Sequence, residues 1–225
     1  MRLVPDEPER AERDEDRADH KDGGTDHNGD EPERHVNENP AMASDRRPQN
    51  PAGLPLLVLV TGPPAAGKTA IAEALRDRRG LPLIAKDTLK ETLGSELAVT
   101  ERAESARLGA AVFQLLAVVV HELLRAGVSV IVEGNFNASS ALFVQLPPAR
   151  IVQVHLTAEP QVLRSRLLAR DPHRHPVHWD GQAADEIAAR AAGGEWGALD
   201  LPGRLVAVDT TVWPDLEELE RLVFA

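Results

Sequence analysis

One eight-residue stretch constrains this chain more than any other feature: Gly62-Pro63-Pro64-Ala65-Ala66-Gly67-Lys68-Thr69. It matches the pattern G-x-x-x-x-G-K-S/T, follows the apolar run 56–60 and opens a segment with helical periodicity. Glycines permit backbone angles and close approaches that a Cβ would block. Successive backbone N–H groups and a helix N-terminus then surround an anion. The stretch therefore predicts a strand–loop–helix unit that binds the phosphates of a nucleotide.

The two polar side chains of this loop have separate expected roles. Lys68 places a point charge on the β- and γ-phosphates, and the Thr69 hydroxyl reaches a Mg²⁺ ion that bridges the same phosphate oxygens. We therefore expect ATP and Mg²⁺ as ligands, with residues 62–69 as the nucleotide site. A plain strand-to-helix turn is the alternative interpretation. The motif predicts a nucleotide site but does not identify a reaction.

Strand and helix signals alternate along the rest of the chain. Apolar runs predict strands at 56–60, 81–85, 128–132, 151–156 and 205–208. Helical patterns lie at 67–79, after Asp87, and at 100–126, 139–146, 159–170, 182–192 and from 214. This alternation predicts an α/β fold of the P-loop NTPase type, with three α/β/α layers, a five-stranded parallel sheet and a helical lid.

Composition separates an N-terminal tail from the domain. Residues 1–50 carry 15 acidic and 8 basic side chains and few large aliphatic ones, so we expect residues 1–53 to be a disordered acidic tail and 54–225 the domain. Met42 is a second candidate start. The chain has no cysteine, no apolar leader, and a longest apolar stretch, 110–120, that is too short to span a bilayer. A cytoplasmic protein with no membrane association is expected.

Carboxylates follow the second and third predicted strands. Asp87 comes after 81–85, which in a parallel sheet ends at the same edge as the phosphate loop. It is able to accept the proton of an alcohol that attacks the γ-phosphate, or to act only as the N-cap of the next helix. Glu133 is a candidate for a magnesium-bound water or a substrate hydroxyl, with a solvent-facing strand end as the alternative. Lys86 and Lys90 are interpreted as exposed charges.

Arginines gather in the later helix and the loop after it. Arg166 and Arg170 share a helix face, and Arg174 follows in a loop rich in histidine and proline. Guanidinium groups that close over a triphosphate neutralise the charge on the transferred group and exclude water. A basic surface face on an acidic protein is the alternative. The loop histidines, without a matching carboxylate cluster, are interpreted as structural and not as a metal site.

The order of these motifs resembles small P-loop kinases related to chloramphenicol phosphotransferase, zeta toxin and the kinase part of polynucleotide kinase. The sequence looks closest to actinobacterial proteins labelled AAA-family ATPases or ATP-binding proteins. The likeness covers residues 56–224 and depends on five segments: 62–69, Ala85-Lys86-Asp87, Val132-Glu133-Gly134-Asn135-Phe136, 166–178 and Val208-Asp209-Thr210-Thr211.

The resemblance implies roles for matching residues. Asp87 matches the general base, Glu133 and Asn135 match a loop on the substrate side, and the catalytic lid arginines match Arg166, Arg170 and Arg174. Asp209 and Thr210 match a loop close to the adenine. Two departures stand out, because the family commonly has glycine at the positions of Ala65 and Val177. The first is expected to stiffen the loop, and the second affects the lid.

We therefore predict a P-loop kinase that transfers the γ-phosphate of ATP to a hydroxyl of a small molecule. One alternative is an ATP-binding protein or ATPase with no acceptor. Another is a polynucleotide 5′-hydroxyl kinase, which ranks lower because the chain has no tyrosine, few other aromatic residues and a net charge of −11. The sequence does not indicate the acceptor, the oligomeric state or a protein partner such as an antitoxin.

Overall fold

The central strand of the sheet is β1, Leu56–Thr61, which is buried along its whole length. A strand covered on both faces carries a continuous apolar run without alternation, as 56–60 does. It pairs in parallel with β3 on one side and β4 on the other. The computed structural model describes residues 53–170, 174–179 and 183–225.

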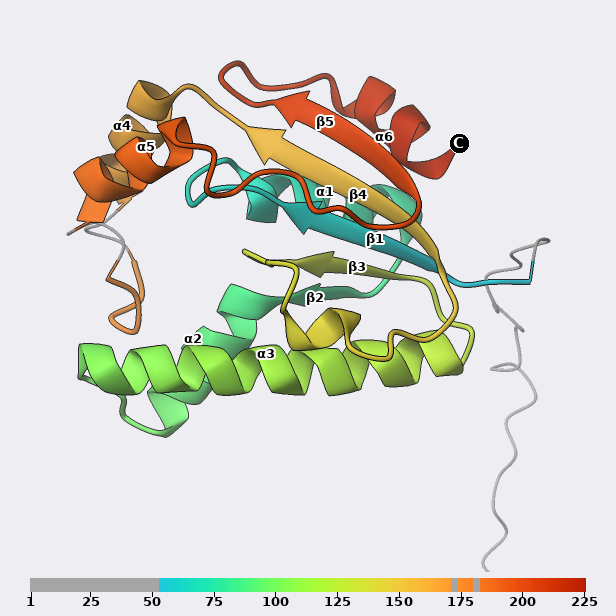
Figure 1. Ribbon diagram of the computed structural model, residues 1–225, viewed down its shortest axis with the longest axis horizontal. Coiled ribbons are helices and arrows are strands. Elements are labelled where there is room, and N and C mark those ends of the chain that lie inside the picture. Colours follow the sequence, from blue (N-terminus) through green and yellow to red (C-terminus); the bar gives the residue numbers. More distant parts are fainter. Residues whose placement is uncertain (1–52, 171–173, 180–182) are drawn as a thin grey trace, which may run out of the picture. The chain divides into compact units, whose positions relative to one another are not determined.

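The five strands run parallel in the order β2-β3-β1-β4-β5, and their arrowheads all point the same way in Figure 1. The strands beside β1 are β2 Leu83–Ala85, β3 Val130–Glu133, β4 Arg150–Thr157 and β5 Arg204–Asp209. The predicted α/β fold with a five-stranded parallel sheet is confirmed. The predicted tail, 1–53, lies almost entirely outside the described residues.

Helices cover both faces of the sheet (Figure 1). On one face α1 and α6 pack through Ile71, Leu75, Leu219 and Val223. On the other face α3 packs through its own apolar stripe against β1 and β3. The helices are α1 Lys68–Arg79, α2 Lys86–Glu96, α3 Arg102–Arg125, α4 Pro160–Arg170, α5 Ala184–Ala192 and α6 Leu216–Phe224. These are the three layers that the sequence predicts.

Helix α3 is the long, strongly apolar helix of the fold. Among the described helices it alone has the length and hydropathy to cross a bilayer. Its residues Leu116, Val120 and Leu124 are nonetheless buried in the core between the helix and the sheet. This stripe is what a core helix of a globular domain requires.

Two predicted elements differ in the structure. The helix predicted at 139–146 is only the short 3₁₀ helix η2, Ala141–Phe143. Pro147 and Pro148 follow, and proline disfavours helical angles in the residue before it. Helix α2 begins at Lys86, one residue before the position expected for its cap.

Candidate active site

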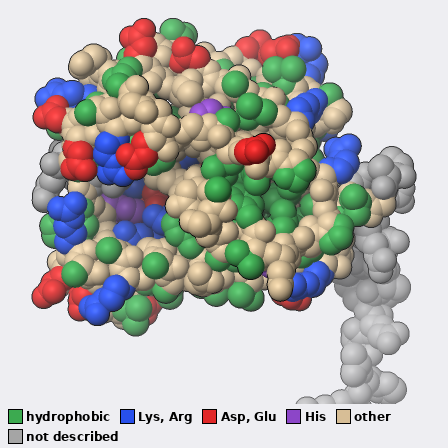
Figure 2. All heavy atoms as spheres, viewed as in Figure 1, with side chains coloured by type: hydrophobic (Ala, Val, Ile, Leu, Met, Phe, Trp, Pro, Cys, Tyr) green, Lys and Arg blue, Asp and Glu red, His purple; other side chains and the backbone are tan. Residues whose placement is uncertain are grey.

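A cavity of about 330 Å³ lies where the phosphate loop meets the carboxyl ends of β2 and β3. Figure 2 shows the molecule hollowed at this end, with basic and histidine side chains in its depth. Most of the predicted site residues line it. The lining comprises Pro64, Ala65, Gly67, Lys68, Thr69, Ala70, Asp87, Glu133, Asn135, Arg166, Arg170 and Arg174.

The loop backbone has the shape that an anion site needs. Gly67 has φ of 85° and forms the N-cap of α1, so the helix N-terminus opens onto the cavity. Gly62 has φ of 135°, and a Cβ there would lie 2.3 Å from the Leu156 carbonyl oxygen. Position 62 therefore requires glycine, because any side chain there would clash with the backbone of β4. Ala65 adopts the left-handed region, with φ of 64°. A glycine would avoid that strain, which explains why glycine is expected there.

The loop side chains divide between the cavity and the core. Lys68 is 8% exposed, and its Nζ donates to the Pro63 carbonyl at 2.8 Å. Thr69 is exposed at the cavity. Ala66 is fully buried in the core and its carbonyl accepts from Thr210. Lys68 and Thr69 are therefore the polar side chains of the loop that line the cavity.

Asp87 lies in the first turn of α2 and is not its cap. The N-cap is Ala85, and the Asp87 carboxylate instead contacts Lys86 Nζ at 2.9 Å and Arg174 at 2.7 Å. Burial alone would raise the pKa of Asp87, but Lys86, His178 and Arg174 outweigh it and hold the pKa well below its usual range. The carboxylate is therefore ionised at neutral pH, faces the cavity and is a weak base at rest.

Glu133 ends β3 beside the phosphate loop, paired with Val60 of β1. It is 3% exposed, so it is not a solvent-facing strand end. Burial raises its pKa, and the Lys68 charge opposes that rise. Within the described chain, Glu133 Oε2 and Asn135 Oδ1 are buried without a hydrogen-bond partner. Buried polar atoms are normally satisfied, so these two oxygens are candidates for contact with a ligand, an ion or an ordered water.

Arg166 braces the phosphate loop. Its guanidinium donates to the Thr210 carbonyl at 2.6 Å and approaches the Ala65 carbonyl at 3.5 Å. The Thr210 side chain is fully buried, and its hydroxyl lies 2.9 Å from the backbone carbonyl oxygens of both Ala66 and Thr157, either of which can accept its proton. Neither Thr210 nor the exposed Asp209 lines the cavity. Their positions make them supports of the loop after β5, and the predicted adenine contact remains a prediction.

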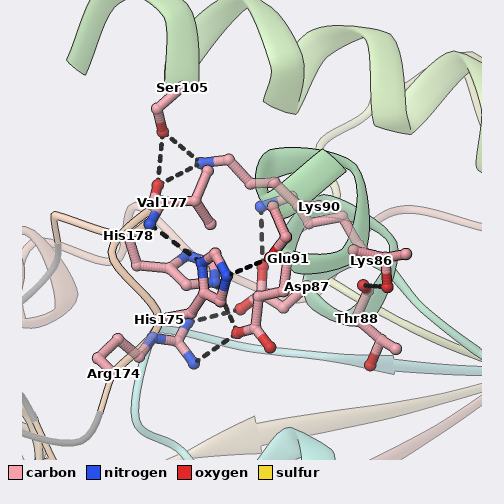
Figure 3. Close-up of polar contacts among 12 residues, drawn as sticks. Lys86, Asp87, Thr88, Lys90, Glu91, Ser105, Arg174, His175, Val177 and His178 are labelled. Carbon is pink, nitrogen blue, oxygen red and sulfur yellow. Dashed lines mark hydrogen bonds and ion pairs between the residues drawn. The ribbon is translucent and has the colours of Figure 1, made fainter. Parts of the chain in front are cut away.

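Residues 174–178 lie against α2, and Figure 3 shows Arg174 and His178 beside Asp87 and Glu91. Arg174 bridges Asp87 and Glu91, and His178 Nε2 lies 2.8 Å from the same Glu91. The His175 ring contacts Ser95 at 2.9 Å. Both histidines thus hold the segment in place, and His173 lies outside the described residues. Arg170 and Arg174 enter the cavity wall from this side.

Val177 anchors the segment between α2 and α3. Its side chain is 1% exposed and packs with Leu108 and Val112. Its carbonyl accepts from Ser105 Oγ at 2.6 Å and Lys90 Nζ at 3.3 Å (Figure 3). A valine in place of the family's glycine therefore fills a pocket that a glycine would leave empty.

Sequence reasoning missed two lysines. Lys90, interpreted as an exposed charge, is 8% exposed and bound to Ser105. Lys86, also interpreted as exposed, pairs with Asp87 and is 15% exposed. The two lysines lie four residues apart in α2 and so share one helix face. This spacing could have shown that both side chains point in the same direction.

Known proteins resemble this chain in sequence and in fold. Residues 57–193 match the family model described as an AAA domain. A candidate kinase from Chloroflexus aurantiacus J-10-fl is 32% identical, with a TM-score of 0.69, and the match covers 76% of this chain and 97% of that one. No curated protein matches this chain.

Two more distant structures share the fold. A sugar kinase from Janibacter sp. HTCC2649 is 18% identical, with a TM-score of 0.51 over 75% of this chain and 91% of that one. A shikimate kinase from Bacteroides thetaiotaomicron is 19% identical, with a TM-score of 0.50 over 76% of this chain and 99% of that one. The family model spans more than half of this chain, and with the Chloroflexus protein it establishes that the chain belongs to the AAA domain family of P-loop proteins.

Proposed function

We propose that this protein is an ATP- and Mg²⁺-dependent phosphotransferase that moves the γ-phosphoryl group to a hydroxyl of a small molecule. One observation carries the proposal. The Asp87 carboxylate lines the same cavity as Lys68 and Thr69, so a hydroxyl held by Asp87 faces the end of a bound triphosphate. The fold shared with sugar and shikimate kinases is consistent with this chemistry.

The proposed reaction follows from the side chains in the cavity. The acceptor oxygen forms a bond to the γ-phosphorus while the bond from that phosphorus to the β–γ bridging oxygen breaks, and ADP leaves. Lys68, Arg170 and Arg174 stabilise the charge on the transferred group. Asp87 orients the hydroxyl and takes its proton as the new bond forms. A depressed pKa suits this role, because a loose transition state needs little help from a strong base.

The cavity also fits Mg²⁺. Thr69 supplies a hydroxyl there, and Glu133 supplies a buried oxygen that lacks a partner among the described residues. The described chain holds no cluster of three or more His, Asp or Glu side chains. Protein ligands would therefore be few and phosphate oxygens would complete the set, as Mg²⁺ in such sites prefers. When bound, the ion would neutralise charge on the β- and γ-phosphates.

A metabolite screen tests the proposal. The protein, ATP and Mg²⁺ are incubated with pooled hydroxyl compounds, and products are detected by a mass gain of one phosphoryl group. We expect a product with the wild type and none with Lys68→Ala, which should also weaken nucleotide binding in calorimetry. Release of free phosphate alone would favour an ATPase. Phosphorylation of oligonucleotide ends with a steep salt dependence would favour a polynucleotide kinase.

A further inference from the structure

A second cavity of about 220 Å³ adjoins the first and has Asp87 and Asn135 in its wall as well. It lies on the side away from the phosphate loop, between α2, the start of α3 and the segment that ends at Trp179. A group placed at Asp87 and Asn135 is therefore accessible from both cavities. The second cavity is where an acceptor would sit.

Its wall is strongly basic. Lys86, Lys90 and Arg102 line it against the single carboxylate of Asp87. Lys86 is paired with Asp87, and Lys90 is fixed to Ser105 and the Val177 carbonyl. These bonds hold the ammonium groups in place, and basic side chains outnumber carboxylates among the described residues of the wall. A negatively charged ligand would gain more from this wall than a neutral ligand of the same size.

Among the basic residues of the wall, Arg102 indicates most about the charge of a ligand. It is exposed, and within the described part of the chain no carboxylate lies within salt-bridge distance of it. It is also the first residue of α3, where the helix dipole disfavours a cation. An anion bound in the cavity would neutralise this charge and offset its unfavourable interaction with the helix dipole.

Two further groups in the wall have unused hydrogen-bonding capacity. Trp179 Nε1 and Asn135 Oδ1 are buried without partners in the described structure. A buried donor and a buried acceptor in the wall of one small cavity suit a compound with several hydroxyls. The cavity is smaller than the roughly 300–1,000 Å³ typical of larger ligands, which favours a compound of sugar size.

We propose that the acceptor is a small polyhydroxy anion. Its carboxylate or phosphate pairs with Arg102, its hydroxyls contact Trp179 and Asn135, and its reacting hydroxyl meets Asp87. This inference depends on the proposed function only for the contact between the reacting hydroxyl and Asp87. Binding of the anion itself does not require phosphoryl transfer.

The test measures binding and transfer separately. Aldonates of four to six carbons are compared with alditols of the same carbon number and with sugar phosphates. Binding is followed by tryptophan fluorescence in the wild type and in Trp179→Phe, which should lose the signal. We expect aldonates or sugar phosphates to bind at least about tenfold more tightly than alditols, the effect of one hydrogen bond to a charged group. The preferred class identifies the anion as carboxylate or phosphate.

Matched variants locate the anion. Arg102→Gln should weaken binding of the anionic compound about tenfold and leave alditol binding unchanged, and Arg102→Lys should restore part of the loss. Arg107→Gln removes the same charge from the exposed side of α3, outside the cavity, and should change nothing.

The outcomes separate the two proposals. Equal binding of alditols and aldonates, or equal behaviour of Arg102→Gln and Arg107→Gln, would overturn the anionic acceptor even if some neutral compound is phosphorylated. Selective anion binding that depends on Arg102, without any transfer from ATP, would support the anion site and contradict the kinase.

Discussion

Replacing Asp87 with asparagine should separate nucleotide binding from phosphoryl transfer. The substitution keeps the shape of the side chain and one oxygen for Lys86 or Arg174, but removes the negative charge and the proton acceptor. Because the carboxylate lines the phosphate cavity, its charge repels a bound triphosphate. ATP should therefore bind as tightly to Asp87→Asn as to the wild type, or more tightly.

The size of each effect follows from the environment of Asp87. Loss of a positioned proton acceptor lowers transfer about 10²–10⁴-fold. Loss of like-charge repulsion near the surface strengthens ATP binding by at most about tenfold. Both ion pairs are partly exposed, with side chains 15% to 33% accessible, so the free energy of unfolding should fall by only about 1 kcal/mol.

The assay pairs calorimetry of a non-hydrolysable ATP analogue with the transfer rate on an identified acceptor. Asp77→Asn serves as a matched control, because Asp77 is an exposed aspartate on α1 that pairs with Arg76 outside the cavity. It should leave both measurements unchanged. Equal transfer by the wild type and Asp87→Asn would refute the role given to this carboxylate, and a large loss of ATP affinity would refute its position beside the phosphates.

Three further predictions concern the loop, the lid and the buried glutamate. Ala65→Gly should change the free energy of unfolding by less than about 1 kcal/mol in urea titrations, because relief of the left-handed strain is offset by the backbone entropy of glycine; a loss above about 2 kcal/mol would contradict this. Val177→Ala removes two buried carbons and should cost about 2 kcal/mol and raise the KM for ATP by loosening the lid. An unchanged unfolding midpoint would show that Val177 is not an anchor. Glu133→Gln should stabilise the protein at about pH 7 and not at about pH 4. Burial raises the pKa of Glu133 in the folded state above its value in the unfolded state, so the free energy of unfolding falls as the pH rises between these two values. Glutamine cannot ionise, so Glu133→Gln removes this loss at about pH 7. A larger stabilisation at about pH 4 than at about pH 7 would contradict the direction of the pKa shift.

The phosphate loop and the sheet were predictable because their signals are local. The glycines of the motif, the apolar run of β1 and the helical periodicity after Lys68 lie within a few dozen residues of each other. The parallel direction of the strands followed from the alternation of strands and helices. Helix α2 was harder, since Asp87 suits an N-cap in isolation and only its contacts show otherwise.

The contacts that residues 174–178 make with α2 could not be predicted from sequence. Arg174 and Asp87 lie 87 residues apart, and the same distance separates Val177 from Lys90. No periodicity or composition signal pairs residues at such a separation. At Val177 the only sequence signal is the resemblance to the family, which commonly has glycine there. That signal predicted an altered lid, whereas the Val177 side chain fills a pocket in the structure.

The two carboxylates of the cavity show why residue type alone does not assign a role. Asp87 follows β2 and Glu133 ends β3, on paired strands. Lys86 and Arg174 lower the pKa of the first, while burial raises the pKa of the second, and the charge on Asp87 adds to that rise. Opposite pKa shifts in one cavity separate the tasks of two similar groups. Asp87 keeps its charge and pairs with Arg174, and under the proposed function it would also hold the acceptor hydroxyl. A nearby cation would favour the ionised form of Glu133, and a magnesium ion held near Thr69 would supply that positive charge.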